Sequence, residues 1–210
     1  TTAEPVPDTK KTPFSDEEIE KVYENKDNEW VETVLLYLFS GFRLNELLSM
    51  ELSKINLEDG TFNGGSKTAS GKDRIVPIHS IIYPIVEKRV KNNKKYLIEY
   101  EGKKLSKSQY YIFWNELMDK LEMKHTPHEC RHTFRTKLDS AGANKKSIDL
   151  MMGHKSKDVG ERIYTHKTIE ELKEAIELFK INDKKSEEKW HFLLWTNNKL
   201  VTKNRQNANI

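Results

Sequence analysis

Apolar residues recur at every third or fourth position along most of the chain, which is the spacing of a helix with one buried face. The helices that this pattern predicts cover residues 15–25, 30–40, 80–92, 107–121, 127–141 and 145–152. Ser15 and Glu18 have the spacing of a capping box, so the first helix should begin there. Residues 30–40 are apolar enough to predict a buried helix.

Three short stretches, 54–57, 61–67 and 74–78, instead have the composition of β-strands and are separated by turn sequences around Gly60 and Gly71. They predict a small antiparallel sheet. The expected fold is therefore mainly α-helical with a small antiparallel β-sheet, an α+β arrangement.

The domain organisation follows from shifts in composition. Residues 1–13 hold three of the six prolines and predict a linker, residues 14–180 predict one domain, and residues 181–210 predict a tail. The apolar run 190–195 is too short to span a membrane. Because the chain begins without methionine, we expect it to be a piece of a longer protein.

Composition narrows the class of protein only slightly. A single cysteine, Cys130, excludes an internal disulfide framework and fits a reducing cytoplasm. The net charge of +3 does not by itself indicate a nucleic-acid partner, but basic residues gather between 88 and 107. That stretch is either a solvated surface or a contact for the DNA backbone. Five of its residues are candidates for such contacts: Lys88, Arg89, Lys91, Lys94 and Lys95.

Polar residues that suit chemistry gather between residues 126 and 164. His128 and Arg131 are three positions apart on a predicted helix and should point the same way. Gly153 should end the next helix, so that His154 directly follows the helix end, and Tyr164 follows ten residues later. Such a cluster has no obvious structural purpose, which favours a catalytic role.

Two further candidates lie earlier in the chain. Arg43 follows a buried helix, where a cation is costly unless it meets an anion. Glu46, one turn later, is either that anion or a residue that orients Arg43 toward a bound phosphate. Lys67 lies beside the second predicted turn, where it could reach into a cleft or simply be exposed.

The string from His128 to His132 also matches H-E-x-x-H, the zinc-peptidase pattern in which Glu129 would be the base. Two observations oppose zinc: Pro127 starts the helix at the motif, and the cationic Arg131 inside it would repel a metal. A third hypothesis is a DNA-binding module without activity.

Five segments of the chain must be considered together: SGFRLNELLSM, SKTASGKDRIVPI, TPHECRHTF, MMGHKS and IYTH. With these segments in this order, the chain resembles the tyrosine recombinases, and within them the integrases of phages and conjugative transposons. The likeness covers about residues 14–179. It implies a mostly helical catalytic domain with a small sheet that carries the lysine, preceded in the full protein by a DNA-binding domain. Type IB topoisomerases share most of the chemistry but surround the tyrosine differently.

The resemblance implies site-specific recombination through a covalent 3′-phosphotyrosyl intermediate, for integration and excision of a mobile element. Tyr164 would be the nucleophile, and Lys67 would protonate the leaving 5′ oxygen. His128 would accept the tyrosine proton or hold the phosphate, and His154 would hydrogen-bond the phosphate. Arg43 and Arg131 would bind its non-bridging oxygens, supported by Glu46. No metal, ATP or other cofactor is expected.

The expected partners follow from the same resemblance. They are double-stranded DNA at recombination sites, three further copies of the chain in a tetrameric synapse, and an accessory directionality factor, in a bacterial cytoplasm and without a membrane. Thr168 and Glu171 predict a capping box for a last helix. Its apolar stripe consists of Ile169, Leu172, Ile176 and Phe179. In the family, the segment beyond the tyrosine passes to a neighbouring protomer. We expect the apolar stripe to be exchanged in the same way when the chain is bound to DNA.

Overall fold

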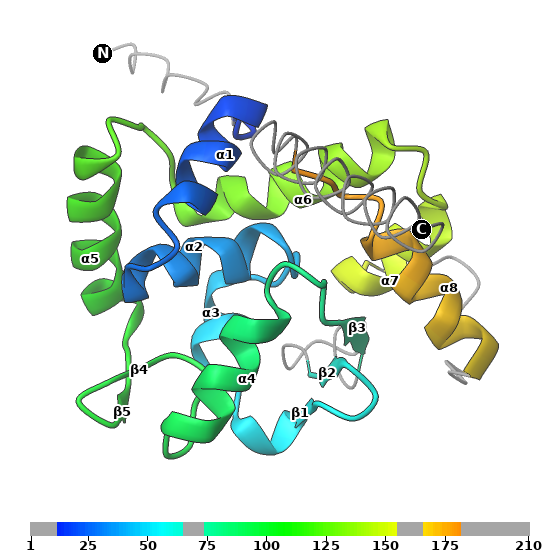
Figure 1. Cartoon of the computed structure of the whole chain (residues 1–210), viewed down its shortest axis with the longest axis horizontal. Coiled ribbons are helices and arrows are strands. Elements are labelled where there is room, and N and C mark those ends of the chain that lie inside the picture. Colours follow the sequence, from blue (N-terminus) through cyan, green and yellow to red (C-terminus); the bar gives the residue numbers. More distant parts are fainter. Residues whose placement is uncertain (1–11, 65–73, 155–165, 182–210) are drawn as a thin grey trace, which may run out of the picture. The chain divides into compact units, whose positions relative to one another are not determined.

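The computed structural model describes residues 12–64, 74–154 and 166–181 (Figure 1). Lys67 and Tyr164 lie outside the described residues. The chain divides into two compact units, Thr1–Lys180 and Ile181–Ile210, and all the elements below belong to the first. The domain boundaries inferred from composition remain a prediction.

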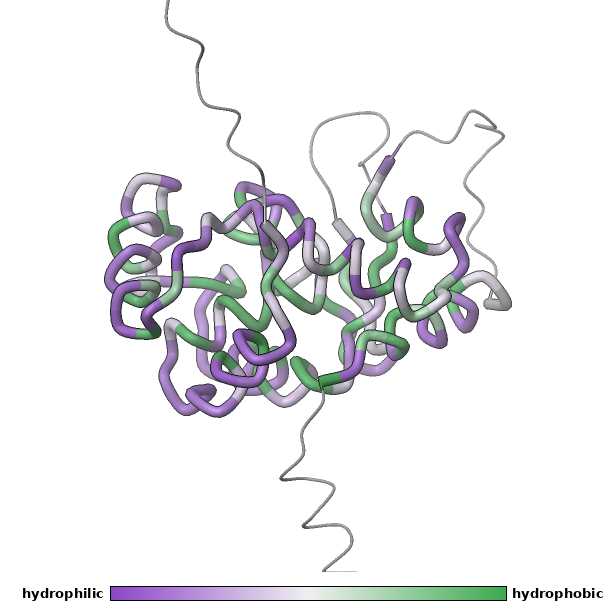
Figure 2. Tube along the Cα trace, turned by 90° about the horizontal axis from the view of Figure 1, so that it is seen from above, coloured by the Kyte–Doolittle hydropathy of each residue, from purple (hydrophilic) through white to green (hydrophobic). Residues whose placement is uncertain are grey.

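Helix α2 (Glu29–Leu38) lies at the centre of this unit and packs against α1 (Asp16–Glu24), α5 (Lys107–Lys120) and α6 (Pro127–Ser140) (Figure 1). Every residue of α2 from Val31 onward is buried, as its apolar composition predicts. The side chain of Asn28 caps the helix by accepting a hydrogen bond of 2.8 Å from the Trp30 backbone N–H. Hydrophobic and hydrophilic stretches alternate along the helices (Figure 2).

The start of α1 is likewise set by capping side chains. The Ser15–Glu18 capping box begins α1 as predicted. Helix α7 (Lys145–Met152) has the expected bounds, but α4 (Tyr83–Asn92) begins later than predicted. Pro84, which lacks a backbone N–H, lies in the first turn of α4, where a helix tolerates it.

The predicted sheet is present in shortened form. Strands β1 (Ile55–Asn56), β2 (Thr61–Asn63) and β3 (Ile75–Pro77) are antiparallel in the order β1-β2-β3, with Phe62 opposite Val76. Three short elements were not predicted by residue pattern: η1 (Leu52–Lys54) and the hairpin β4 (Glu99–Tyr100) and β5 (Lys103–Lys104). Helix α3 (Leu44–Leu48) follows Arg43 directly.

Helix α8 (His166–Ile176) packs against α7 and β3 of its own chain. The capping-box prediction at Thr168 is wrong, because the helix already includes the two residues before it. Leu172, Ile176 and Phe179 are buried, and the Phe179 ring stacks on Phe39 at 4.3 Å between centroids. The stripe therefore docks on its own chain in this structure. None of the described helices is long and apolar enough to cross a membrane.

Gly41 is required by its position between α2 and Arg43. Its φ of +63° is left-handed, and an added Cβ would lie 2.5 Å from Cδ1 of the buried Phe134 ring. Gly41→Ala should lower the free energy of unfolding by about 3 kcal/mol or more. Gly60 is the matched control, since it has the same φ and nothing within 4 Å of its Cβ position.

Gly60→Ala should therefore cost only the backbone strain, about 1–2 kcal/mol. Chemical denaturation of both variants measures the difference. Equal losses of stability would show that the contact with Phe134 does not constrain this turn.

Candidate anion-binding site

Arg131 is the centre of the site and is buried on α6, with 4% of its surface exposed. Its Nη1 donates a hydrogen bond to the carbonyl of Gly41, and its Nη2 donates one of 2.6 Å to the carbonyl of Met152. The guanidinium thereby connects the end of α2 and the end of α7 to α6. Both carbonyls hold it in one orientation.

His154 lies beside Arg131 because Gly153 ends α7 in the left-handed conformation, with φ of +64°. Nη2 of Arg131 lies 3.3 Å from Nε2 of His154. On the other side of the imidazole ring, Nδ1 of His154 lies 3.2 Å from Oδ1 of Asp149. Because arginine can only donate, Nε2 is the acceptor and Nδ1 carries the proton toward Asp149. Burial lowers the pKa of His154, with Arg131 adding to the effect and Asp149 opposing it.

Arg43 lies at the start of α3, two residues after Gly41, whose carbonyl binds Arg131. Its Nη1 donates to Oε1 of Glu46 at 3.0 Å, and its backbone N–H donates to Oε2 at 2.8 Å. Its side chain remains 41% exposed, so it can also bind a ligand from solution. Glu46 thus contacts Arg43, which both alternatives expected from the sequence require.

A third arginine, Arg74, was missed by the sequence analysis. It is fully buried and binds Glu46 through a fork, with Nη1 to Oε1 at 3.1 Å and Nη2 to Oε2 at 2.7 Å. Burial alone would raise the pKa of Glu46, but Arg74 and then Arg43 outweigh it and lower that pKa to about 2. The only signal in the sequence was an arginine directly before an apolar strand.

Positive charge dominates around Arg131. Burial, followed by the neighbouring charges of Arg43 and Arg74, lowers the pKa of Arg131 to about 9, and Arg135 adds to the effect. The carboxylate of Glu46 has the opposite effect and raises the pKa of Arg131. Arginines held this close together in a buried setting are stabilised by an anion.

His128 is an exposed residue in the first turn of α6, one turn before Arg131. Its ring meets that of His132 edge to face at 4.8 Å. The structure therefore brings Arg43, Arg131 and His154 together, with His128 on the same helix. The predicted roles of these residues, and of Lys67 and Tyr164 outside the described part, remain predictions.

Glu129, the expected base of the zinc-peptidase pattern, has a structural role in this fold. Its carboxylate accepts hydrogen bonds from the backbone N–H groups of Thr12 at 3.0 Å and Thr126 at 2.6 Å, and lies 3.4 Å from Nδ1 of His125. Burial would raise the pKa of Glu129, but these N–H groups outweigh it and lower the pKa. Glu129 is thus the capping carboxylate of α6, which leaves it poorly suited to act as a general base.

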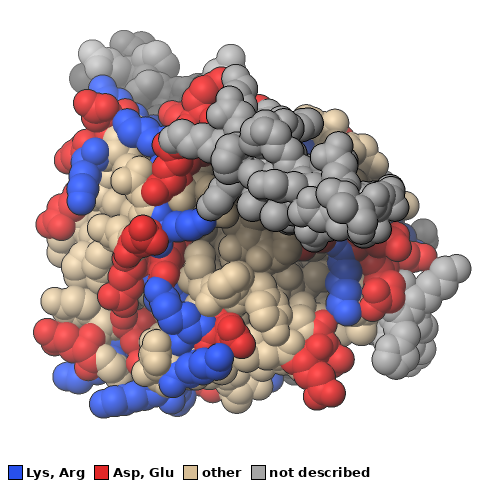
Figure 3. Space-filling view, viewed as in Figure 1, with Lys and Arg blue, Asp and Glu red and all other residues tan. Residues whose placement is uncertain are grey.

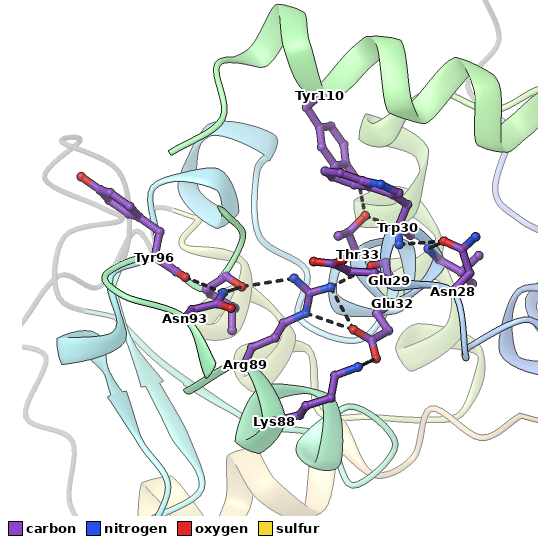
Figure 4. Close-up of polar contacts among 12 residues, drawn as sticks. Asn28, Glu29, Trp30, Glu32, Thr33, Lys88, Arg89, Asn93, Tyr96 and Tyr110 are labelled. Carbon is purple, nitrogen blue, oxygen red and sulfur yellow. Dashed lines mark hydrogen bonds and ion pairs between the residues drawn. The ribbon is translucent and has the colours of Figure 1, made fainter. Parts of the chain in front are cut away.

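The basic stretch expected to contact DNA is less available than its sequence suggests. Arg89 is wrongly predicted as a surface contact, because its guanidinium is buried and binds Glu32 and the carbonyl of Glu29 (Figure 4). Lys88 binds the other oxygen of Glu32. Lys91 and Lys95 form exposed pairs with Glu87 and Glu51, and Lys94 remains a candidate on the surface. Basic and acidic side chains are interspersed over the face shown in Figure 3.

Inorganic phosphate should bind between Arg43 and Arg131 and stabilise the fold. At a concentration of about ten times Kd the gain is about 1.4 kcal/mol, seen as a higher Tm. The control is potassium chloride at equal ionic strength, and Arg43→Gln should remove most of the difference between the two salts. An identical response of the variant and the original chain would exclude a phosphate site at Arg43.

Comparisons with known proteins show what the chain as a whole is similar to. The model of the phage integrase family matches residues 14–171. The chain is 32% identical over 184 residues to the tyrosine recombinase XerA of Pyrococcus furiosus, covering 82% of the chain and 63% of the relative. It is 29% identical to XerA of Pyrococcus horikoshii, covering 80% of the chain and 61% of that protein. The chain thus spans about three fifths of the length of these relatives.

Solved structures show the same fold. The integrase of mycobacterium phage Brujita superposes with a TM-score of 0.67 at 18% identity, covering 87% of this chain and 61% of that one. The Tn1549 transposon integrase, solved in complex with circular intermediate DNA, gives a TM-score of 0.62 at 21% identity over 75% of this chain and 61% of its own. By sequence model, relatives and fold, the chain belongs to the phage integrase family.

Proposed function

We propose that the chain is the catalytic domain of a site-specific DNA recombinase. The observation that carries this proposal is the convergence of Arg43, Arg131 and His154, from three distant parts of the sequence, around a site with excess positive charge. Membership of the phage integrase family supports DNA as the anion. The XerA relatives are named tyrosine recombinases, which supports the type of reaction.

In the proposed reaction, the Tyr164 hydroxyl attacks a DNA phosphodiester. A bond forms between the tyrosine oxygen and phosphorus, the bond to the 5′ oxygen breaks, and Lys67 supplies the proton that this oxygen takes up. The phosphoryl group remains on Tyr164 as a 3′-phosphotyrosyl ester. Because the ester keeps the bond energy, the 5′ hydroxyl of another strand can reverse the step without ATP.

The described residues act on the phosphate rather than on the leaving group. Arg43 and Arg131 bind the two non-bridging oxygens, whose charge grows in the transition state, through the N–H donors that their contacts with the protein leave over. A bound phosphate would also favour a proton on Nε2 of His154, and Asp149 beside Nδ1 would stabilise the resulting imidazolium. We propose that His128, which lies one helical turn from Arg131, takes the tyrosine proton.

The proposal is tested by incubating the chain with a pool of end-labelled, nicked duplexes of random sequence. The short strand beyond the cut diffuses away, so that a covalent complex accumulates and migrates slowly on a denaturing gel. We expect a protein–DNA adduct whose DNA, once sequenced, shows the preferred site. DNA binding without any adduct would favour a binding module without activity.

The assembly is part of the same proposal. We propose that four copies of the chain meet in the synapse, exchange their C-terminal segments, and take their direction from an accessory factor in a bacterial cytoplasm. Because Leu172, Ile176 and Phe179 are buried in the chain's own core, a deletion from residue 168 would remove core residues.

Deletion of residues 182–210 is therefore the cleaner test of exchange. The truncated chain should bind and cleave a single site but fail to join two sites in a gel-shift assay. Normal strand exchange by the truncated chain would contradict the proposed role of that segment.

A further inference from the structure

Arg74 is a fully buried arginine to which the proposed reaction assigns no role. Its fork binds both oxygens of Glu46, and its guanidinium lies over the Phe42 ring, 4.7 Å from the ring centroid. Its Nε–H finds no acceptor among the described residues. Burial of a guanidinium with an unmet donor carries a substantial cost in free energy, which an ordinary apolar residue would avoid.

The position of Arg74 in the chain relates it to the site. It directly precedes β3, and its carbonyl accepts a hydrogen bond of 3.0 Å from the Gly64 backbone N–H. Gly64 and Arg74 therefore pair at the two ends of segment 65–73, which contains Lys67. The side chain of Arg74 is also linked to Arg43, because both bind the carboxylate of Glu46.

The shared carboxylate couples the two arginines. Oε1 of Glu46 accepts from Nη1 of both Arg74 and Arg43, while Oε2 accepts from Nη2 of Arg74 and from the Arg43 backbone N–H. The plane of the Arg74 guanidinium fixes the plane of the carboxylate, because both atoms of the fork are engaged. The carboxylate in turn fixes the direction of the Arg43 side chain.

We propose that Arg74 is a positioning residue for strand cleavage, which orients Arg43 through Glu46 and ties it to the base of the segment containing Lys67. This role rests on the proposed recombinase function. A lysine at the same position would keep the charge but make a single contact with Glu46, so the orientation of Arg43 would be lost.

The same domain contains a matched pair that has no link to the site. Arg89 is also buried, and its Nε and Nη2 donate to Oε2 of Glu32 at 3.2 and 2.9 Å (Figure 4). It joins α4 to α2, and its remaining bonds are to the backbone carbonyls of Glu29 and Leu97. Arg89→Lys therefore reports what the loss of a buried arginine fork does to the fold alone.

The experiment compares Arg74→Lys with Arg89→Lys in three measurements: chemical denaturation, DNA affinity, and the single-turnover rate of adduct formation at saturating nicked DNA. Both variants should lose stability. Arg74→Lys should slow adduct formation by about tenfold or more with little change in DNA Kd, because misplaced groups chiefly affect the reacting geometry. Arg89→Lys should retain the rate at a temperature at which it is folded.

A double variant tests whether Arg74 acts through Arg43. In an Arg43→Ala background, Arg74→Lys should produce a much smaller further loss of rate than it does alone. If Arg74→Lys does not fold at the assay temperature, Glu46→Gln is compared with Glu32→Gln instead. Glu46→Gln should then slow adduct formation, and Glu32→Gln should retain the rate.

Equal rates for Arg74→Lys and Arg89→Lys, or losses that simply add in the double variant, would overturn the positioning role while the recombinase function stands. Failure of the unmodified chain to form any adduct would overturn the proposed function, and the positioning role with it.

Discussion

Replacement of Arg131 by alanine is expected to slow strand cleavage at saturating DNA by about a hundred- to a thousand-fold. The carbonyls of Gly41 and Met152 hold its guanidinium in place before substrate arrives, so little reorganisation is needed as charge develops on the phosphate. Because the charge grows mainly in the transition state, the rate should fall far more than the DNA affinity. Single-turnover adduct formation and a separate binding titration measure the two quantities.

Arg135→Ala is the control, since Arg135 lies on the same helix but is exposed. It removes one nearby positive charge without removing a phosphate contact, so the rate should change little. If Arg131→Ala lost affinity and rate to the same degree, Arg131 would be an anchor for the DNA backbone and not a group that stabilises the transition state.

Tyr164→Phe is expected to bind DNA as tightly as the original chain and to form no covalent adduct. The substitution removes only the hydroxyl oxygen that would attack phosphorus, and the ring remains. Tyr111→Phe is the control, because Tyr111 lies half-buried on α5 and takes no part in the site. An adduct that persisted in Tyr164→Phe would show that another hydroxyl is the nucleophile.

The helices were predictable because their signals are local. The Ser15–Glu18 pair, the Thr126–Glu129 pair and the left-handed Gly153 each fix a helix end within a few residues of sequence. The Thr168 cap failed because the same side-chain spacing also occurs inside a helix. The hairpin β4–β5 was missed because strands of two residues carry no alternating pattern.

Errors among the charged residues have a different origin, since a side chain's burial depends on partners far away in sequence. Arg89 follows the pattern of a surface cation until Glu32, 57 residues earlier, is placed beside it. Arg74 lies 28 residues after Glu46 and gave no local sign of its fork. The spacing of residues already grouped Arg131 with His154, whereas only the resemblance to a family added Arg43 to them. The tautomer of His154 follows only from the geometry.

The most direct test of the account is to locate the phosphate in the trapped protein–DNA complex. The adduct from the nicked duplex is treated with nuclease and protease, and the peptides are sequenced by mass spectrometry. A nucleotide attached through its 3′ phosphate to Tyr164 is the predicted result. Attachment to any other residue, or a complex that contains no covalent bond, would contradict the assignment of this site to strand cleavage.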